Sequence, residues 1–567
     1  MHREFLYSGV VDGNARNYER HGRVNLDMVK KMRVLTSTAV VASLMVVLLA
    51  ACGGKEESPK TADPSPGTGT EAKEAAYPKS LTYWVSLNPN AAATMKSYNE
   101  IAAYKELEKK TGTKVEFQHP PVGQEKDQFN LMLASGKLPD VIEYGWNAAP
   151  KGADSLIKEK RIIRLNELIE KHAPNLSKVL KDNPSFRKLI TTDEGNIYAM
   201  PFLLGDEMLA VVNGPVLRKD WLDKLDLKMP TTISEWETVL TAFRDKDPNG
   251  NNKKDEIPYF FSIADLDYNH LFVGAWGITS DFYNENGKIK YGPIEPQFKE
   301  FLATMAKWYK DGLIDKDYTT TDAKLKDAKV TNNQLGSLST YPGSGISRYS
   351  LLVQPTTPSF KLAGAPYPGL KSGDKPLGQY TMPFTGIGAA ISASAANPEQ
   401  IVKWLDYKYG QEGHLLFNFG IEGESYKLDN GYPKYTDAIM NNPDKMPITQ
   451  AMAKYFIASW SGPIVQDKRY IEQYFTMPEQ REAAQTWAKA EHAKQMPPIT
   501  LTAEESSKTA SIMNDVKTYR DEMINKFIMG AEPIDNFDKF VQTIKSMGID
   551  EAIKARQAAL ERYNNRK

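Results

Sequence analysis

Leu81-Thr82-Tyr83-Trp84-Val85 opens an alternation of strands and helices, and its apolar and aromatic side chains are typical of a strand. Apolar residues then recur at helical spacing until Gly112, a second strand follows at 115–117, and a second helical stretch ends at Gly136. The third strand is Val141-Ile142-Glu143-Tyr144. The order strand, helix, strand, helix, strand predicts a parallel sheet with helices on both faces.

The loops that follow these strands are candidate ligand sites, because ligands of such sheets bind beyond the carboxyl ends of the strands. These loops and strand ends carry Trp84, Asn88, Tyr144 and Trp146. Farther along, the sequence of residues 193–201 predicts a turn that is followed by a hairpin-like apolar segment. Near the C-terminus the apolar positions Ile512, Val516, Tyr519, Met523 and Phe527 repeat at spacings of 4, 3, 4 and 4 and predict one face of a long helix.

The composition is that of a globular protein with room for two or more lobes. The chain has 567 residues, of which 41% are hydrophobic and 25% are charged. Lys plus Arg equals Asp plus Glu at 71 each, so no net field attracts nucleic acid. A single cysteine excludes an intramolecular disulfide and any zinc site built from several thiolates.

The single cysteine follows a segment with the layout of a signal peptide. Residues 34–51 are apolar or small apart from a few hydroxyl side chains, and basic residues stand just before them. Leu49-Ala50-Ala51-Cys52 resembles a bacterial lipobox, which implies that Cys52 is acylated and anchors the chain to the membrane. We expect a leader at 1–51, with translation starting at Met28, and a disordered tether at 52–77. The alternative is a transmembrane helix with an incidental cysteine.

Seven short segments, taken in order, carry a resemblance to a known family. They are Leu138-Pro139-Asp140-Val141, Gly195-Asn196-Ile197-Tyr198-Ala199-Met200-Pro201, Arg218-Lys219-Asp220-Trp221-Leu222, Pro230-Thr231-Thr232, Phe417-Asn418-Phe419-Gly420-Ile421-Glu422-Gly423, Phe527-Ile528-Met529-Gly530 and Met547-Gly548-Ile549-Asp550. Their order is similar to that of the family 1 extracellular solute-binding lipoproteins, in the long oligosaccharide-binding branch of LipO and the alginate-binding proteins. The similarity covers nearly all of residues 78–563.

The resemblance implies an α/β fold of the two-lobed periplasmic-binding-protein type II, with a helix-rich second lobe. Lobe 1 is expected to contain residues 78–200 and, where the chain comes back from lobe 2, residues from about 384 to 430. Residues 384–391 of this second segment are expected to form a Gly-rich apolar strand. Lobe 2 is expected at about 201–383 and 431–567. The resemblance further implies an extracytoplasmic, lipid-anchored monomer that is not an enzyme and that delivers a sugar or oligosaccharide to the permease subunits of an ABC importer.

Sugar rings stack their apolar C–H faces on flat aromatic rings, and their hydroxyl groups need polar partners. The candidate ligand residues are therefore aromatic or polar: Trp84, Asn88, Tyr144, Trp146, Trp276, Tyr341, Arg348 and Trp460. The alternative for each aromatic residue is core packing, because most of the 9 Trp and 28 Tyr must be structural. Five tryptophans in helix-like stretches are interpreted as packing: Trp221, Trp236, Trp308, Trp404 and Trp487.

One loop is rich in oxygen ligands at alternate positions, which is the pattern that calcium requires. The predicted ligands are Asp247, Asn249, Asn251, the Lys253 carbonyl, Asp255 and Glu256. A rival register starts at Asp245 and places Gly250 at position six and Glu256 at position twelve. The resemblance favours the first register, because the alginate-binding relatives have a calcium site in the matching segment. The alternative to both is a solvated turn.

Two other functions remain open at this level. A secreted carbohydrate-active enzyme, a lyase or glycosidase, would need two carboxylates about 5 to 10 Å apart across the cleavage point. The chain has no G-x-S-x-G, no H-E-x-x-H and no phosphate-binding loop, and its 7 histidines are scattered, so no catalytic residue is predicted. A peptide-binding or adhesin lipoprotein would use the same leader and tether.

Overall fold

The computed structural model describes residues 76–150, 152–458 and 461–566. The predicted leader, Cys52, nearly all of the tether and Trp460 lie outside the described residues. Within the part of the chain that the structure describes, no helix is long and apolar enough to cross a membrane.

The first sheet contains the predicted strand and helix alternation. β1 (Ser80–Trp84) lies between β2 (Lys114–Gln118) and β3 (Val141–Gly145) and is parallel to both. The intervening helices are α2 (Ala102–Thr111) and α3 (Glu125–Ser135). Each helix ends before a glycine in the left-handed conformation, Gly112 with φ 70° and Gly136 with φ 72°, as the sequence predicts.

A strand from the middle of the chain completes this sheet. β11 (Ile387–Ile391) is inserted between β3 and β4 (Met200–Pro201) and is antiparallel to both, which gives the order β2-β1-β3-β11-β4. Gly388 is needed there, because a Cβ atom on it would lie 2.8 Å from the Met200 carbonyl oxygen. The Gly-rich apolar strand predicted near residue 384 is thus β11, and it belongs to the sheet of β1 and β3.

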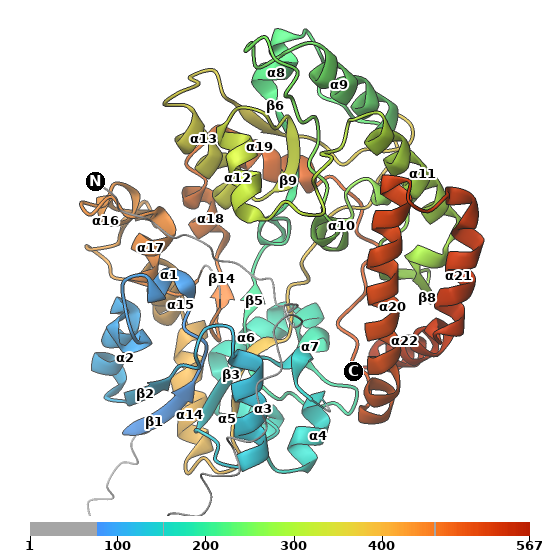
Figure 1. Ribbon diagram of the computed structural model, residues 1–567. Coiled ribbons are helices and arrows are strands. Elements are labelled where there is room, and N and C mark those ends of the chain that lie inside the picture. Colours follow the sequence, from blue (N-terminus) through green and yellow to red (C-terminus); the bar gives the residue numbers. More distant parts are fainter. Residues whose placement is uncertain (1–75, 151, 459–460, 567) are drawn as a thin grey trace, which may run out of the picture. The chain divides into compact units, whose positions relative to one another are not determined.

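The second sheet is smaller and entirely antiparallel, and helices cover it (Figure 1). Its strands, in the order β10-β6-β9, are β6 (Gly214–Arg218), β9 (Ser337–Thr340) and β10 (Leu362–Gly364). The helices of this region include α9 (Ile233–Asp245), α11 (Pro296–Lys310) and α20 (Ala503–Met529). Helix α20 contains the predicted apolar positions, with Val516, Met523 and Phe527 buried.

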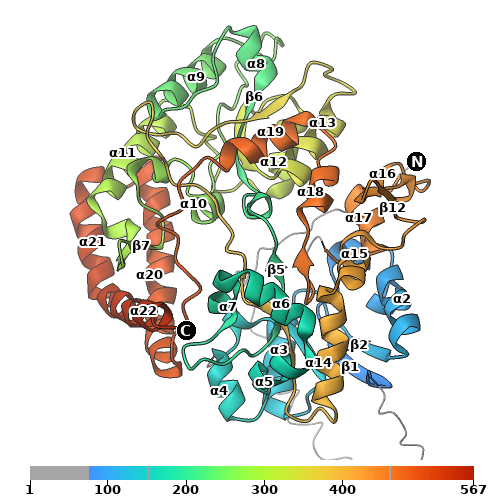
Figure 2. The same cartoon turned by 180° about the vertical axis from the view of Figure 1, so that it is seen from behind.

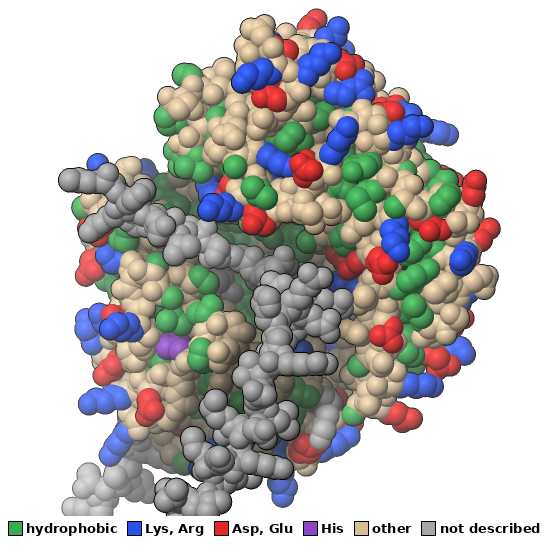
Figure 3. Space-filling view, in the orientation of Figure 1, with side chains coloured by type: hydrophobic (Ala, Val, Ile, Leu, Met, Phe, Trp, Pro, Cys, Tyr) green, Lys and Arg blue, Asp and Glu red, His purple; other side chains and the backbone are tan. Residues whose placement is uncertain are grey.

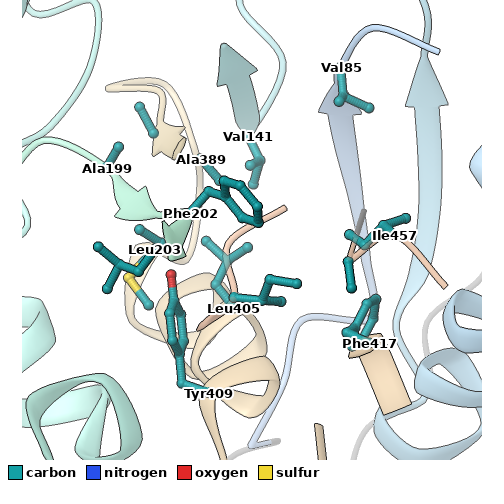
Figure 4. Close-up of a cluster of buried hydrophobic side chains, with 14 of the residues drawn as sticks. Val85, Val141, Ala199, Phe202, Leu203, Ala389, Leu405, Tyr409, Phe417 and Ile457 are labelled. Atoms are coloured by element: carbon teal, nitrogen blue, oxygen red, sulfur yellow. The ribbon is translucent and has the colours of Figure 1, made fainter. Parts of the chain in front are cut away.

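The buried side chains form two separate cores, one around each sheet, and we call the parts of the chain that surround them the first and the second lobe. Figure 4 shows part of the first, where Val141, Phe202, Ala389 and Leu405 gather. Buried residues between Tyr435 and Phe475 belong to this first core. The predicted boundaries instead place residues from 431 onward in lobe 2. This grouping differs from the predicted lobe boundaries, which stay a prediction.

The chain passes between the two cores near Ala210, within residues 368–383 and within residues 476–482. The segments that approach these passages are joined to one another. β5 (Leu203–Leu204) and β14 (Val465–Gln466) pair in parallel, and both views show them side by side (Figures 1 and 2). Thr381 donates a backbone hydrogen bond of 2.8 Å to the Ala210 carbonyl oxygen. The passages therefore form one connected region between the cores.

Candidate ligand-binding site

Four aromatic side chains contact one another at the carboxyl ends of β1 and β3. They are Trp84, Phe129, Tyr144 and Trp146, and we call them the first-lobe ring cluster. Tyr144 stacks on Phe129 with ring centroids 3.9 Å apart and an interplanar angle of 13°. Trp84 and Trp146 lie 6.0 and 6.4 Å from Tyr144 and meet its ring edge-on. The structure thus brings together three of the predicted ligand residues.

The members of this cluster differ in how much of their surface is available. Trp84 is 6% exposed and Trp146 is 2% exposed, and the Trp146 Nε1 donates a 2.9 Å hydrogen bond to the Gly388 carbonyl oxygen. Tyr144 is half-buried. Most of both tryptophan rings is therefore used in packing, and Tyr144 offers the accessible ring. Ligand contact by any of the three stays a prediction.

Charged groups are buried on the opposite face of the same strands. Because side chains alternate along a strand, Tyr83 and Glu143 point away from Trp84 and Tyr144. The Tyr83 hydroxyl donates a 2.7 Å hydrogen bond to Glu143 Oε2, whereas the buried Oε1 has no hydrogen-bond partner among the described residues.

Lys408 is completely buried beside this pair and is enclosed by aromatic rings. Its Nζ lies 4.8 Å from the Trp404 ring centroid, 4.9 Å from those of Tyr104 and Phe417, and 5.7 Å from that of Tyr83. Burial lowers the pKa of Lys408 to about 7, although nearby Glu143 opposes this change. The first-lobe ring cluster therefore rests on a core that contains a titratable group.

A second pair of rings lies in the second lobe. Tyr341 directly follows β9, and its ring centroid is 6.0 Å from that of Tyr268, which belongs to α10 (Ile263–Asn269). Tyr268 is 42% exposed and Tyr341 is 39% exposed. Tyr341 is one of the predicted ligand residues, whereas Tyr268 is not, because no strand-end pattern in the sequence marks it. Its exposure as a large ring beside another ring is what identifies it.

Both ring groups lie at the sheet ends from which the chain passes between the cores. In the first lobe, the Trp146 backbone N–H donates to the Gly386 carbonyl oxygen at 2.9 Å, just before β11. In the second lobe, Thr340 pairs with Gly214, where β6 begins after the passage near Ala210. The Asn269 side chain also donates to Asn213 Oδ1 at 2.9 Å. A ligand that touches both groups would lie beside the passages.

The other predicted ligand residues have partners within the protein. Arg348 donates two hydrogen bonds to Asp327, at 3.0 and 2.5 Å. The Trp276 Nε1 donates to Glu300 Oε2 at 3.0 Å. The Asn88 side chain accepts a 2.8 Å hydrogen bond from the backbone N–H of Asn90 and caps α1 (Pro89–Ala92). Their roles toward a ligand stay predictions.

The oxygen-rich loop follows α9 and is closed by its own hydrogen bonds. Asp247 accepts from the backbone N–H groups of Gly250, Asn251 and Asn252 at 3.0 to 3.1 Å. The side-chain amides of Asn249 and Asn251 donate to Asp255 at 3.1 and 3.0 Å. Over the described ranges, no group of three or more His, Cys, Asp or Glu side chains could hold a metal ion as arranged.

One atom of this loop remains unsatisfied. Glu256 Oε1 is buried without a hydrogen-bond partner in the described part of the chain, and burial raises the pKa of its carboxyl group. Gly250 and Asn252 both have positive φ, 73° and 59°, so the backbone does not distinguish the two predicted registers. The donor set of carboxylates, amides and a carbonyl is of the kind that calcium takes.

Charges of both signs alternate over the face that Figure 3 shows, in agreement with the equal numbers of acidic and basic residues. Two surface pockets lie elsewhere on the first lobe. One of about 330 Å³ is lined by residues that include Tyr77, Asn175 and Asp406. One of about 460 Å³ is lined by residues that include Lys105, Glu424 and Tyr455. Neither contains a residue of the two ring groups.

The fold has the α/β architecture of the periplasmic-binding-protein type, with a helix-rich second part, as the sequence predicts. Residues 88–414 match the profile of the bacterial extracellular solute-binding protein family. Because this match covers more than half of the chain, the protein belongs to that family. The predicted resemblance is confirmed.

Two curated relatives match at low identity but over long stretches. The fructooligosaccharide ABC transporter substrate-binding protein FusA of Streptococcus pneumoniae is 26% identical, and the alignment covers 95% of this chain and 100% of FusA. Lipoprotein LipO of Bacillus subtilis is 25% identical over 65% of this chain and 71% of LipO.

Solved structures share the fold. The alginate-binding protein AlgQ2, solved without calcium ion, is 27% identical with a TM-score of 0.67, and the match covers 85% of this chain and 98% of AlgQ2. An EF-hand mutant of FusA in complex with fructo-nystose is 23% identical with a TM-score of 0.67, covering 86% of this chain and all of that one. FusA and AlgQ2 are both named as binding proteins.

Proposed function

We propose that this protein captures an oligosaccharide between its two lobes and delivers it, chemically unchanged, to an ABC importer. The observation that supports the proposal is the placement of the first-lobe ring cluster and the Tyr268–Tyr341 pair, each at a sheet end beside the passages. Rings on both lobes can stack on a sugar only when the lobes approach each other, so binding favours the closed state.

A neutral sugar is the class that the site favours. A uronate is best recognised by a cation whose charge is not already paired, and the charge of Arg348, the predicted cationic ligand residue, is paired with Asp327 through two hydrogen bonds. The full-length similarity to a fructooligosaccharide-binding protein supports the same class. Fructo-oligosaccharides of three to five units are therefore the first ligands to test.

The experiment is calorimetric titration with fructo-oligosaccharides, oligogalacturonates and short peptides, followed by chromatographic analysis of the sugar recovered after prolonged incubation. We expect saturable binding of a neutral oligosaccharide and its complete recovery. Cleavage of the sugar would instead indicate a carbohydrate-active enzyme. Binding of peptides alone would favour the peptide-binding alternative.

We also propose that Cys52 carries the lipid anchor and places the protein on the outer face of the cell membrane as a monomer. The support is the small, apolar segment before the only cysteine. Metabolic labelling with palmitate should mark the wild-type chain in the membrane fraction. Cys52→Ser should lose the label and leave the membrane, and a Cys52→Ser chain that stays membrane-bound would contradict the anchor.

A structural calcium ion in the loop 247–256 is a further part of the proposal. Rotating the amides of Asn249 and Asn251 would turn their oxygens toward Asp255 and Glu256, and a cation would satisfy the buried Glu256 Oε1. In the first register, Asp247→Asn should abolish the rise in melting temperature on adding calcium, and Asp245→Asn should keep it. Loss of the calcium effect in Asp245→Asn would favour the rival register, in which Asp247 is also a ligand, and no calcium effect on the wild type would exclude the site.

A further inference from the structure

The last helix of the protein has its two ends buried in different cores. Helix α22 (Ile549–Asn564) has 16 residues and is therefore about 24 Å long. Ile549 and Ala552, near its start, belong to the second core, whereas Leu560 and Tyr563, near its end, belong to the first. This helix is a further connection between the lobes, in addition to the three passages.

Charged groups hold the end of α22 against the first lobe. Asp193, in the turn that follows α7 (Pro184–Ile190), accepts a 2.8 Å hydrogen bond from Arg562 Nε and another of 2.8 Å from Arg566 Nε. The Arg566 side chain is 1% exposed and that of Asp193 is 12% exposed. Lys188 of α7 also donates to the Asn564 carbonyl oxygen at 3.2 Å. Removing one partner of such a partly buried pair leaves the other charge unpaired, which costs more than breaking an exposed pair.

The start of α22 is fixed to the second lobe through its neighbours. Helix α22 packs beside α20 and α21 (Phe537–Ser546), and the three are adjacent in both views (Figures 1 and 2). In α20, the buried Arg520 donates to Asp267 Oδ2 and to the Ser280 carbonyl oxygen, each at 2.7 Å. The C-terminal helices are thus fixed to the second lobe, and the Asp193 contacts, together with the packing of Leu560 and Tyr563, attach them to the first.

We propose that α22 is a strap between the lobes and that Asp193 is its pivot, which stays attached while the lobes close and so limits their relative orientations. A stiff helix attached at both ends removes many orientations that the passages alone would allow. With fewer orientations in the free protein, less conformational freedom is lost on closing around a ligand. The effect on affinity rests on the proposed function, whereas the effect on the free protein does not.

The test compares the full chain carrying Cys52→Ser with the same chain carrying Asp193→Asn. Spin labels on cysteines introduced at the exposed Lys137 and Lys324, one on each lobe, report the distribution of distances between the lobes. Asp193→Glu retains a carboxylate for the two arginines and is the conservative variant. Glu522→Gln removes an exposed carboxylate that pairs only within α20, with Lys526, and is the matched control.

We expect Asp193→Asn to broaden the distance distribution without ligand and to weaken oligosaccharide binding about tenfold. Asp193→Glu and Glu522→Gln should behave as the wild type does, and thermal unfolding confirms that each variant folds. Unchanged distances in folded Asp193→Asn would overturn the strap, and tighter binding would overturn the pivot because the contact would then oppose closure. Broadened distances with no sugar bound by any variant would support the strap and count against the proposed function.

Discussion

The two ring groups are built in opposite ways. In the first lobe, Trp84 and Trp146 are 6% and 2% exposed and are packed against Phe129 and Tyr144, over a core that contains buried charges. In the second lobe, Tyr268 and Tyr341 are 42% and 39% exposed, and their rings contact each other. The first group is part of the folded core and the second is a surface feature. Substitutions should therefore affect stability in the first lobe and binding in the second.

The largest effect is expected for Trp146→Ala. The ring is buried and its Nε1 is bonded to Gly388, so its loss leaves a cavity and should lower the free energy of unfolding by about 3 to 5 kcal/mol. Chemical denaturation measures this change. Trp146→Phe keeps a ring and should lose about half as much. An unfolding free energy within about 1 kcal/mol of wild type for Trp146→Ala would contradict the packing role.

The next effect concerns pH and the buried Lys408. Its pKa is about 7 in the folded protein and about 10.5 when exposed, so between these values the unfolded chain binds the extra proton. The contribution of Lys408 to the free energy of unfolding should therefore rise by about 3 kcal/mol from pH 7 toward pH 10. Below pH 7 this contribution should not change with pH. Burial raises the pKa values of the neighbouring Tyr83 and Tyr104 well above 10, so both stay neutral in this window.

Denaturation at several pH values with the variant Lys408→Met tests this. Glu143, the charged group that acts on the pKa of Lys408, remains in the variant, as do the neighbouring Tyr83 and Tyr104. We expect the rise between pH 7 and pH 10 to disappear in Lys408→Met, whatever the variant's stability at pH 7. An equal rise in both proteins would assign the pH dependence to another group.

The smallest effects are expected in the second lobe. Tyr268→Ala and Tyr341→Ala should each weaken oligosaccharide binding about tenfold by removing a ring that stacks on sugar. Because both side chains are exposed, the free energy of unfolding should change by less than about 0.5 kcal/mol. The corresponding Phe variants keep the ring and should retain most of the affinity. Normal binding by both Ala variants would remove this pair from the site.

Local patterns in the sequence predicted the features that depend on neighbouring residues. The alternation through β3, the helix ends at Gly112 and Gly136, and the long helix α20 are confirmed. The five tryptophans interpreted as packing are all buried: Trp221, Trp236, Trp308, Trp404 and Trp487. Each of these predictions follows from hydrophobic periodicity or a turn residue, which act over a few positions.

Several features that depend on long-range contacts were not predicted. Buried residues between 435 and 475 belong to the first core, and α22 connects the two cores. The spacing of apolar residues in these segments does not indicate which core their apolar faces pack against. Tyr268 lies beside Tyr341 only because α10 and β9 meet at Asn213. The four rings around Lys408 likewise come from four separate elements.

Small-angle X-ray scattering tests the central claim most directly, namely that two lobes close on a sugar. The protein is measured alone and with an oligosaccharide that calorimetry has shown to bind. If the lobes close on the sugar, the radius of gyration should be smaller and the distance distribution more compact with the sugar bound. Superimposable scattering curves at saturating ligand would contradict it.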